Sequence, residues 1–120
     1  MKIQLKLCYR LWFECEGEDV MGNGMIRLLL EVRNLGSLKK AAESLHMPYR
    51  GAWGRIKKAE EALGIPLLES SRQRQKGVEL TPSALNLLDT FMQLDTMCHD
   101  FLLDRLGKVE SDTFILSSVR

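Results

Sequence analysis

The feature that most constrains the fold is a segment over residues 82–106 in which apolar residues recur at helical spacing. Thr81 and Pro82 are typical of an N-cap and a first helical turn, because the proline nitrogen needs no hydrogen bond there. The pattern therefore predicts one long helix. Its apolar residues form two adjacent lanes, Ala84, Leu87, Phe91, Leu94, Cys98 and Phe101 in one and Leu85, Leu88, Met92 and Leu102 in the other.

Two apolar lanes are wider than one small core requires, so we expect a second surface to cover the helix over 82–106. The most economical cover is the same helix from a second copy of the chain, which predicts a homodimer formed through this helix or through the first strand region. The alternative is a helix that folds wholly onto its own domain. The residues expected at the dimer interface are Leu87, Phe91, Leu94, Cys98 and Phe101.

The size and charge of the chain narrow the choice of fold and partner. A chain of 120 residues, 45% of them apolar, is long enough for one compact domain and too short for two ordinary ones. The net charge of +1 hides an uneven distribution: residues 39–76 carry nine Lys and Arg against four Asp and Glu, whereas residues 77–120 carry three against seven. The basic middle favours a polyanion-binding surface. The alternative is that these charges are the solvated faces of a helical domain.

The sequence carries no pattern typical of secretion, membrane insertion, metal binding or catalysis. The three cysteines form no CxxC pair, and their odd number argues against a disulfide framework or a zinc site. No apolar run approaches the ~18 residues of a membrane span, and the N-terminus lacks a signal-peptide core. We expect a soluble cytoplasmic protein without a membrane partner, a metal or a cofactor. We also expect no enzymatic activity, because no nucleophile or carboxylate pair accompanies a histidine in a catalytic pattern.

The first half of the chain changes from a strand pattern to a helix pattern. Apolar residues recur at every second position from Ile3 to Phe13, which predicts a half-buried strand within residues 1–15. The stretch "EGEDVMGNG" then supplies turn residues. Capping and proline signals predict three helices within residues 24–64. These helices run from about Met25 to Asn34, from the N-cap Ser37 to about Leu45, and from Pro48 to Gly64.

The third of these helices, "HMPYRGAWGRIKKAEEALG", combines two glycines with several basic residues. Each interior glycine weakens a helix by roughly 1 kcal/mol relative to alanine. We expect Gly54 to let the backbone approach a partner surface and Gly51 to allow close helix packing. The alternative is that both glycines lie on the surface without a specific role, where the fold tolerates them. At about 100° per residue, the core side carries Ala52, Ile56, Ala59 and Leu63, and the opposite side carries Arg50, Gly54, Lys57 and Glu61.

A basic hairpin is predicted over residues 67–81, where the segments "IPLLES" and "VELT" indicate two short strands joined by the loop "SRQRQKG". The order of elements predicts a mainly α fold with a small β-sheet. More closely, it predicts a single winged helix-turn-helix domain with an N-terminal strand and a long C-terminal helix. Residues 107–120 are expected to form a tail, and "TFILSSVR" at its end is either a short added strand or a frayed end.

This order of elements assigns the third helix to the major groove of DNA, where arginine can donate two hydrogen bonds to guanine. Arg50 is the residue expected to read bases, with Lys57 next to it. Tyr49 is expected on a phosphate or a base edge. Trp53 lies on a flank of the helix, where packing in the core is favoured over contact with DNA.

The remaining basic residues are expected to contact the DNA backbone. The amides behind Ser37 are available to a phosphate, and the loop of the hairpin would lie on phosphate or in the neighbouring minor groove. The complete set of residues expected to bind DNA is Ser37, Lys39, Lys40, Tyr49, Arg50, Trp53, Gly54, Lys57, Arg72, Arg74 and Lys76.

The stretch "GSLKKAAESLHMPYRGAWGRIKKAEEALGIPLLESS", together with "VELTPSALNLL", resembles the N-terminal DNA-binding domains of LysR-type regulators and of molybdate-dependent, ModE-type regulators. The shared features are the Gly-Ser before the second helix, the double alanine, the Leu-Gly-x-Pro-Leu run at 63–67 and the Leu-Thr-Pro before the last helix. The ModE type is favoured by the N-terminal strand and by Tyr49, Arg50, Ala52 and Trp53. The resemblance covers almost all of residues 3–106.

The resemblance implies a dimeric winged helix that binds double-stranded DNA as a transcriptional regulator, with the N-terminal strand packed beside the wing. ModE-type regulators bind molybdate through further C-terminal domains, so no molybdate-binding residue can be carried over to this chain. Regulation by a separate sensor protein and simple autoregulation are both compatible with the sequence. Two departures stand out: Pro48 replaces the serine of the family, and the wing is more basic and less rich in glycine.

Two other functions stay open at this point. A winged helix could serve only as a protein-interaction or dimerisation module, which would tolerate Arg50→Ala and Lys57→Ala without losing its partner. A sensor could use Cys8, Cys15, Cys98 and His99 to bind a metal or respond to oxidation, although their spacings do not favour a ligand set.

Overall fold

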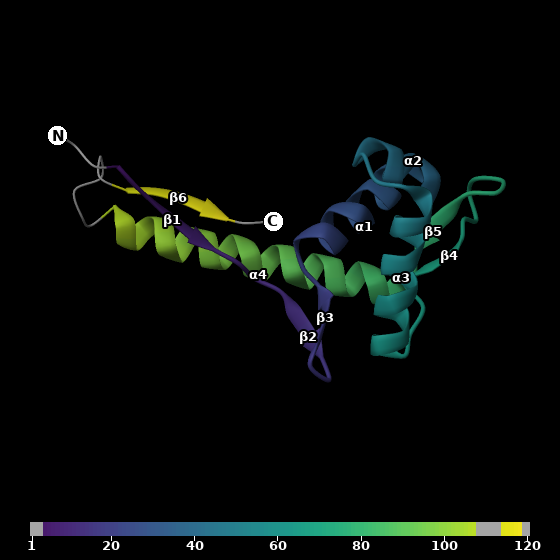
Figure 1. Cartoon of the computed structure of the whole chain (residues 1–120), viewed down its shortest axis with the longest axis horizontal. Coiled ribbons are helices and arrows are strands. Elements are labelled where there is room, and N and C mark those ends of the chain that lie inside the picture. The colour runs from purple at the N-terminus through teal and green to yellow at the C-terminus, as the bar shows by residue number, and fades with distance from the viewer. Residues whose placement is uncertain (1–3, 108–113, 119–120) are drawn as a thin grey trace.

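The long helix predicted over residues 82–106 is confirmed and organises the molecule. The structure is a computed structural model that describes residues 4–107 and 114–118, so the rest of the predicted N-terminal strand and tail lies outside it. Helix α4 spans Pro82–Leu106, and the Thr81 hydroxyl caps it by accepting a hydrogen bond from the Ala84 amide at 3.2 Å. The first half of α4 lies against the other helices, whereas its second half extends away from them (Figure 1).

Three shorter helices precede α4. The Ser37 hydroxyl caps the second of them by accepting a hydrogen bond from the Lys40 amide at 3.1 Å, as predicted. The first ends at Gly36, whose φ of 68° favours glycine, and the third follows Pro48. Their bounds are Asn23–Leu35 for α1, Leu38–Ser44 for α2 and Tyr49–Leu63 for α3.

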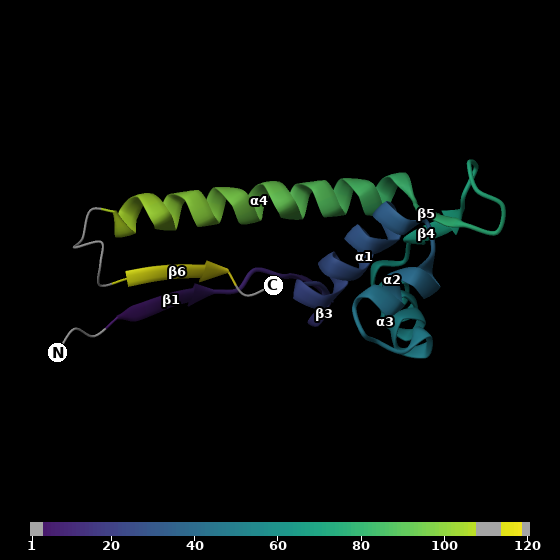
Figure 2. The ribbon, with the colours of Figure 1, turned by 90° about the horizontal axis from the view of Figure 1, so that it is seen from above.

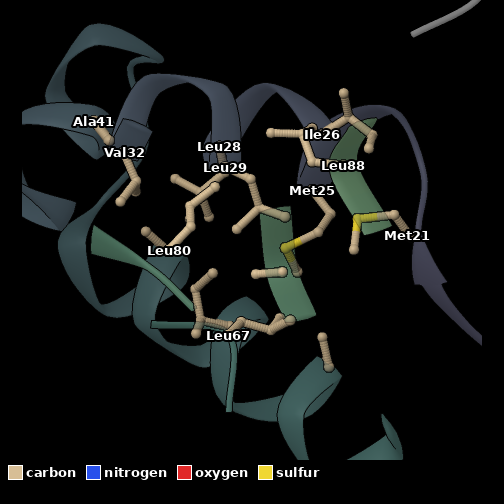
Figure 3. Packing of buried hydrophobic residues seen from close by; sticks show 14 of the residues in the cluster. Met21, Met25, Ile26, Leu28, Leu29, Val32, Ala41, Leu67, Leu80 and Leu88 are labelled. Atoms are coloured by element: carbon tan, nitrogen blue, oxygen red, sulfur yellow. The ribbon is translucent and has the colours of Figure 1, made fainter. Parts of the chain in front are cut away.

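The apolar sides of all four helices meet in one core (Figure 3). Leu28 of α1 and Leu88 of α4 are completely buried there, and Leu67 fills the space directly after α3. Ala41 and Ala52 are also buried, and their small side chains let α2 and α3 pack closely. This core holds α3 with one side against the protein and the other in solvent.

The predicted basic hairpin is present and is fastened to the end of α1. Its strands β4 and β5, Leu68–Ser70 and Val78–Leu80, are antiparallel. The Val78 amide donates a hydrogen bond to the Gly36 carbonyl at 3.1 Å, and the Arg74 guanidinium donates one to the Leu35 carbonyl at 2.6 Å. Both bonds satisfy carbonyls at the C-terminal end of α1, where the hydrogen-bond ladder of a helix runs out.

The single N-terminal strand predicted within residues 1–15 is wrong, because three short strands precede α1: Leu5–Tyr9 (β1), Phe13–Cys15 (β2) and Glu18–Met21 (β3). Strands β2 and β3 form an antiparallel hairpin whose turn places Glu16 and Gly17 at positive φ. The break between β1 and β2 at residues 10–12 could not be seen in the alternation of apolar and polar residues. Leu11 and Phe13 both pack against the core and continue that alternation through the break. Glycines on both sides of β3 made that strand look like a turn.

The first strand pairs with the last one, so the expectation that it packs beside the wing is wrong. Strand β6, Phe114–Ser118, runs parallel to β1 with Leu116 opposite Leu7. Of the two alternatives for "TFILSSVR", an added strand is confirmed over residues 114–118. Both strands lie along the second half of α4 (Figure 2), where the Tyr9 hydroxyl lies 3.3 Å from Asp95 Oδ1 and hydrogen bonds to it. The apolar side of α4, rather than the wing, supplies the surface that this small sheet needs.

Candidate nucleic-acid interface

Helix α3 has one buried side and one exposed side. Ala52, Ile56 and Ala59 are buried against the core, as their spacing predicted. Arg50 and Gly54 lie on the opposite, exposed side. The helix lies away from α4, on the side of the helical core that α4 does not cover (Figure 2), so a large partner can reach it.

Arg50 and Gly54 leave the middle of this exposed side open. The Arg50 guanidinium makes no hydrogen bond or ion pair with any residue that the structure describes. A methyl group added at Gly54 would meet no described atom within 4 Å, and one added at Gly51 would only touch the Pro48 ring at 3.8 Å. Gly51 is exposed, so the expectation that it serves close helix packing is wrong.

Two aromatic side chains flank Arg50 on the surface of α3. Tyr49 is 51% exposed and Trp53, one turn further along, is 49% exposed. The expectation that Trp53 packs in the core is therefore wrong. Helical spacing placed this side chain on the flank of α3, but it gave no information on whether a neighbouring element covers that flank.

Lys57 is held in place by two neighbours on its own helix. Its ammonium group lies 5.5 Å from the centroid of the Trp53 ring, within the range of a cation–π contact. The same group lies 3.2 Å from Glu60 Oε1. Part of the charge that the sequence assigned to DNA contact is thus compensated within the protein.

Glu60 joins α3 to the segment that leads into the wing. Its other carboxylate oxygen accepts a hydrogen bond from the Leu67 amide at 2.7 Å. Burial raises the pKa of Glu60, but the hydrogen bonds from the Leu67 and Leu68 amides and the interaction with Lys57 outweigh it, so the net pKa lies below its ordinary value. Glu60 is therefore ionised at neutral pH. It was absent from the predicted set, although its i, i+3 spacing from Lys57 could have indicated the pair.

The start of α2 presents two exposed lysines, Lys39 and Lys40, as predicted. The Lys40 amide already donates its hydrogen bond to the Ser37 hydroxyl. That amide is therefore not available to an anion, whereas the exposed ammonium groups of Lys39 and Lys40 remain available for contact with phosphate.

The three basic residues of the wing are placed differently from one another. Arg72 and Lys76 are exposed and make no hydrogen bond or ion pair within the described ranges. Arg74 instead uses its guanidinium to bind the end of α1, and it lies so close to Gly36 that a methyl group added there would clash with it. Arg74 thus connects the wing to the helical core.

The residues expected at a dimer interface divide between the core and the surface. Phe91 is 3% exposed and packs edge-on against Phe13 with ring centroids 5.9 Å apart, so its assignment to the dimer interface is wrong. Leu87 and Cys98 are half-buried, and Leu94 and Phe101 are exposed. Met97, which was not among the predicted residues, is exposed on the same side of α4 as Leu94 and Phe101, whereas the exposed Leu103 lies on another side of the helix. Hairpin β2–β3 covers Phe91, and the failure to predict that hairpin explains the error.

Within residues 4–107 and 114–118, no helix is long and apolar enough to cross a membrane. No three His, Cys, Asp or Glu side chains of the same ranges gather closely enough to hold a metal ion. All three cysteines are free, and the Cys15 thiol donates a hydrogen bond to the Ala62 carbonyl at 3.1 Å. The described residues thus contain no assembled set of metal ligands that would support the sensor alternative.

A helix-turn-helix followed by a basic hairpin, with an open face on the second of its helices, defines a winged helix-turn-helix DNA-binding domain. The family described as "Bacterial regulatory helix-turn-helix protein, lysR family" matches residues 24–85, which is more than half of the chain. The chain belongs to this family. It is a DNA-binding domain of a transcriptional regulator, as its resemblance to the LysR and ModE types predicted.

Individual relatives agree with this assignment. The transcriptional regulator ModE of Haemophilus influenzae is 29% identical over 98 residues, which cover 79% of this chain and 38% of that protein. The chain thus spans less than half the length of this relative. The structure of the BenM DNA-binding domain with benA site 1 DNA is 25% identical, with a TM-score of 0.53, and covers 70% of this chain and 93% of that one. DarR of Vibrio fischeri, also solved with DNA, shares the fold at 20% identity and a TM-score of 0.51, over 72% of this chain and 28% of that one.

Proposed function

We propose that the chain is the sequence-specific, homodimeric DNA-binding module of a transcriptional regulator, with α3 in the major groove. The observation that carries this proposal is the open side of α3, where the Arg50 guanidinium, which has no partner among the described residues, lies one turn from Gly54. A guanidinium can donate two hydrogen bonds to the edge of guanine. The missing side chain of Gly54 lets the helix backbone come close to the bases.

Contacts to the DNA backbone are assigned to exposed cations on both sides of α3. Lys39 and Lys40 extend from the start of α2, and Arg72 and Lys76 extend from the wing. Such contacts fix the orientation of the protein on the duplex and supply affinity, but they carry no sequence information. The Tyr49 hydroxyl is assigned to a phosphate or a base edge near the start of α3.

A second copy of the chain is proposed to cover the second half of α4. Leu94, Met97 and Phe101 are exposed there, and their i, i+3 and i+7 spacing places them on one side of the helix, where a grouped apolar surface marks an interaction site. Two-fold pairing of α4 would place two copies of α3 on one duplex, which requires a pseudo-palindromic operator. The printed name of the Haemophilus relative and the DNA-bound BenM and DarR structures support a regulatory role on DNA.

The test is selection from a pool of random duplexes, with sequencing of the retained DNA and anisotropy measurements of the selected duplex. We expect a symmetric motif near physiological salt. We expect Arg50→Ala to reduce the affinity for it by about 5- to 150-fold, since a bidentate contact to guanine contributes about 1–3 kcal/mol.

The matched control is Arg33→Ala, because Arg33 forms an exposed ion pair with Asp89 of α4 at 3.5 Å and does not lie on α3. This variant should bind the motif like the wild type. If no motif emerges and binding disappears steeply with salt, only phosphate contacts operate. The proposal of sequence-specific recognition would then be wrong, and the interaction-module alternative would gain support.

A further inference from the structure

The exposed Trp53 ring is fixed in position without being buried. Half of its surface is in solvent, and one face of the ring is covered by the Lys57 ammonium at 5.5 Å. Lys57 is in turn held by Glu60 at 3.2 Å, and Glu60 by the Leu67 amide at 2.7 Å. A chain of contacts from the base of the wing thus orients an aromatic ring at the surface of α3.

The position of Trp53 on α3 places this ring beside the proposed base-reading residue. Arg50, Trp53 and Lys57 are spaced i, i+3 and i+7, so they lie along one strip of the helix surface. The open backbone at Gly54 follows directly. A surface that approaches Arg50 closely enough to hydrogen bond with it therefore also meets the edge of the Trp53 ring.

We infer that Trp53 is a specificity-determining residue that packs against thymine methyl groups in the major groove, next to the base pair read by Arg50. This inference rests on the proposed function. In the major groove, thymine is distinguished by its C5-methyl group, which apolar side chains recognise by contact. The indole edge is the one large apolar surface that this strip of α3 presents.

Two other roles for the ring fit the geometry less well. Insertion between base pairs requires the ring to stack on bases, but the Lys57 ammonium already occupies one face. A phosphate contact would use only the single indole N–H and would leave the apolar surface in water. Lys57, predicted as a DNA contact, is accordingly a positioning residue for Trp53.

The experiment uses the operator found by selection and replaces each of its thymines in turn by deoxyuridine, which lacks only the methyl group. Anisotropy gives the affinity of each duplex for the wild type and for Trp53→Ala, at a low salt concentration where phosphate contacts keep weak variants measurable. For the wild type we expect one or two thymines per half-site whose replacement weakens binding by about fourfold, the value for one buried methyl group. In Trp53→Ala the same replacements should have no effect.

The matched control is Trp12→Ala, because Trp12 is also an exposed tryptophan with a cation, Arg10, 5.6 Å from its ring centroid, but it does not lie on α3. This variant should keep the full deoxyuridine effect. Lys57→Ala should reduce the effect while keeping the arginine-dependent preference for guanine, as expected of a positioning residue.

Two results would overturn the inference while leaving the proposed function intact. One is a wild-type affinity that no deoxyuridine replacement changes. The other is an effect of the same size in Trp53→Ala, which would assign the methyl contact to another side chain. Failure to select any motif is a separate result, since it would contradict the proposed function itself.

Discussion

At the scale of single residues, Gly54 shows a position where folding and binding have opposite requirements. The space above Gly54 is open, so the fold does not require glycine there, and glycine weakens a helix interior by about 1 kcal/mol relative to alanine. The benefit of this glycine therefore lies outside the isolated chain. The missing side chain at Gly54 allows a partner surface to approach the backbone of α3 closely.

We expect Gly54→Ala to raise the free energy of unfolding by about 0.5–1 kcal/mol and to weaken binding to the selected operator. Urea unfolding and anisotropy measure the two effects separately. Gly51→Ala is the control for helix propensity, because Gly51 is exposed on α3 outside the strip that carries Arg50. A Gly54→Ala variant that binds as tightly as the wild type would show that the backbone of α3 does not approach DNA at this point.

Glu60 is expected to make stability depend on pH. Because its pKa is lowered in the folded protein, the ionised form contributes stability that is present above the ordinary value of 4.5 and is lost as the pH falls through the folded-state pKa. Glu60→Gln should therefore lower the free energy of unfolding at pH 7 by about 0.5–1.5 kcal/mol and flatten its dependence on pH below 5. Unfolding curves of both proteins between pH 3 and 7 measure this, and parallel pH profiles would contradict it.

Helical spacing predicted the buried side of α3 correctly but misassigned Trp53 and Phe91. Periodicity gives the angle of a side chain around its helix, whereas exposure depends on which distant element lies at that angle. Phe91 is buried by Phe13 of the unpredicted hairpin, and no described element covers the flank that carries Trp53. Both errors concern contacts between residues far apart in the sequence, because Phe91 has such a contact and the exposed Trp53 lacks one among the described residues.

At the scale of elements, the wing is a short hairpin that depends on α1 for its position. Two hydrogen bonds from the wing end on the last carbonyls of α1, one from Val78 and one from Arg74. The three basic residues of the wing therefore divide into two roles. Arg74 fixes the hairpin, and Arg72 and Lys76, which have no partner within residues 4–107 and 114–118, are available to bind a polyanion.

This division predicts different effects for two arginine substitutions. Arg74→Ala should lower the free energy of unfolding by about 0.5–1.5 kcal/mol and speed hydrogen exchange of the Val78 amide. Arg72→Ala should leave both unchanged and should reduce the slope of log affinity against log salt by about 0.9, the value for one phosphate contact. Urea unfolding, amide exchange and anisotropy at several salt concentrations distinguish the two variants. Identical behaviour of the two variants would contradict the division.

The ends of the helices were the most predictable elements, because their signals are local. Ser37, Thr81 and Pro82 lie at or next to the ends they mark, and the structure confirms the capping bonds of the first two. The pairing of β1 with β6 was not predictable, since the two strands are separated by more than 100 residues. No local signal specifies which of several short apolar segments will be neighbours.

At the scale of the whole molecule, the chain is elongated. Its extents are 57 × 29 × 25 Å and its radius of gyration is 17.3 Å, against about 14 Å for a compact domain of this length. The difference arises from the second half of α4, which carries β1 and β6 on one side and exposed apolar residues along its length. Such a projection suits a structure that is completed by a second copy.

We expect the double substitution Met97→Asp and Phe101→Asp to convert a dimer into a folded monomer, because it places charges in the proposed interface. Sedimentation velocity measures the change in mass, and circular dichroism checks that the helices persist. The same charge at the exposed Trp12, in Trp12→Asp, is the control and should leave the dimer intact. A wild-type protein that sediments as a monomer at all concentrations would contradict the proposed dimer.

The parallel pairing of β1 with β6 also affects the order in which the chain can fold during its synthesis. A ribosome releases β1 before any helix of the core, yet the partner strand of β1 emerges only after α4 is complete. Throughout synthesis β1 therefore keeps an open edge and an apolar face, in the state that is most exposed to aggregation. The helical core can assemble from nearby segments as they emerge, and the sheet on the second half of α4 forms last.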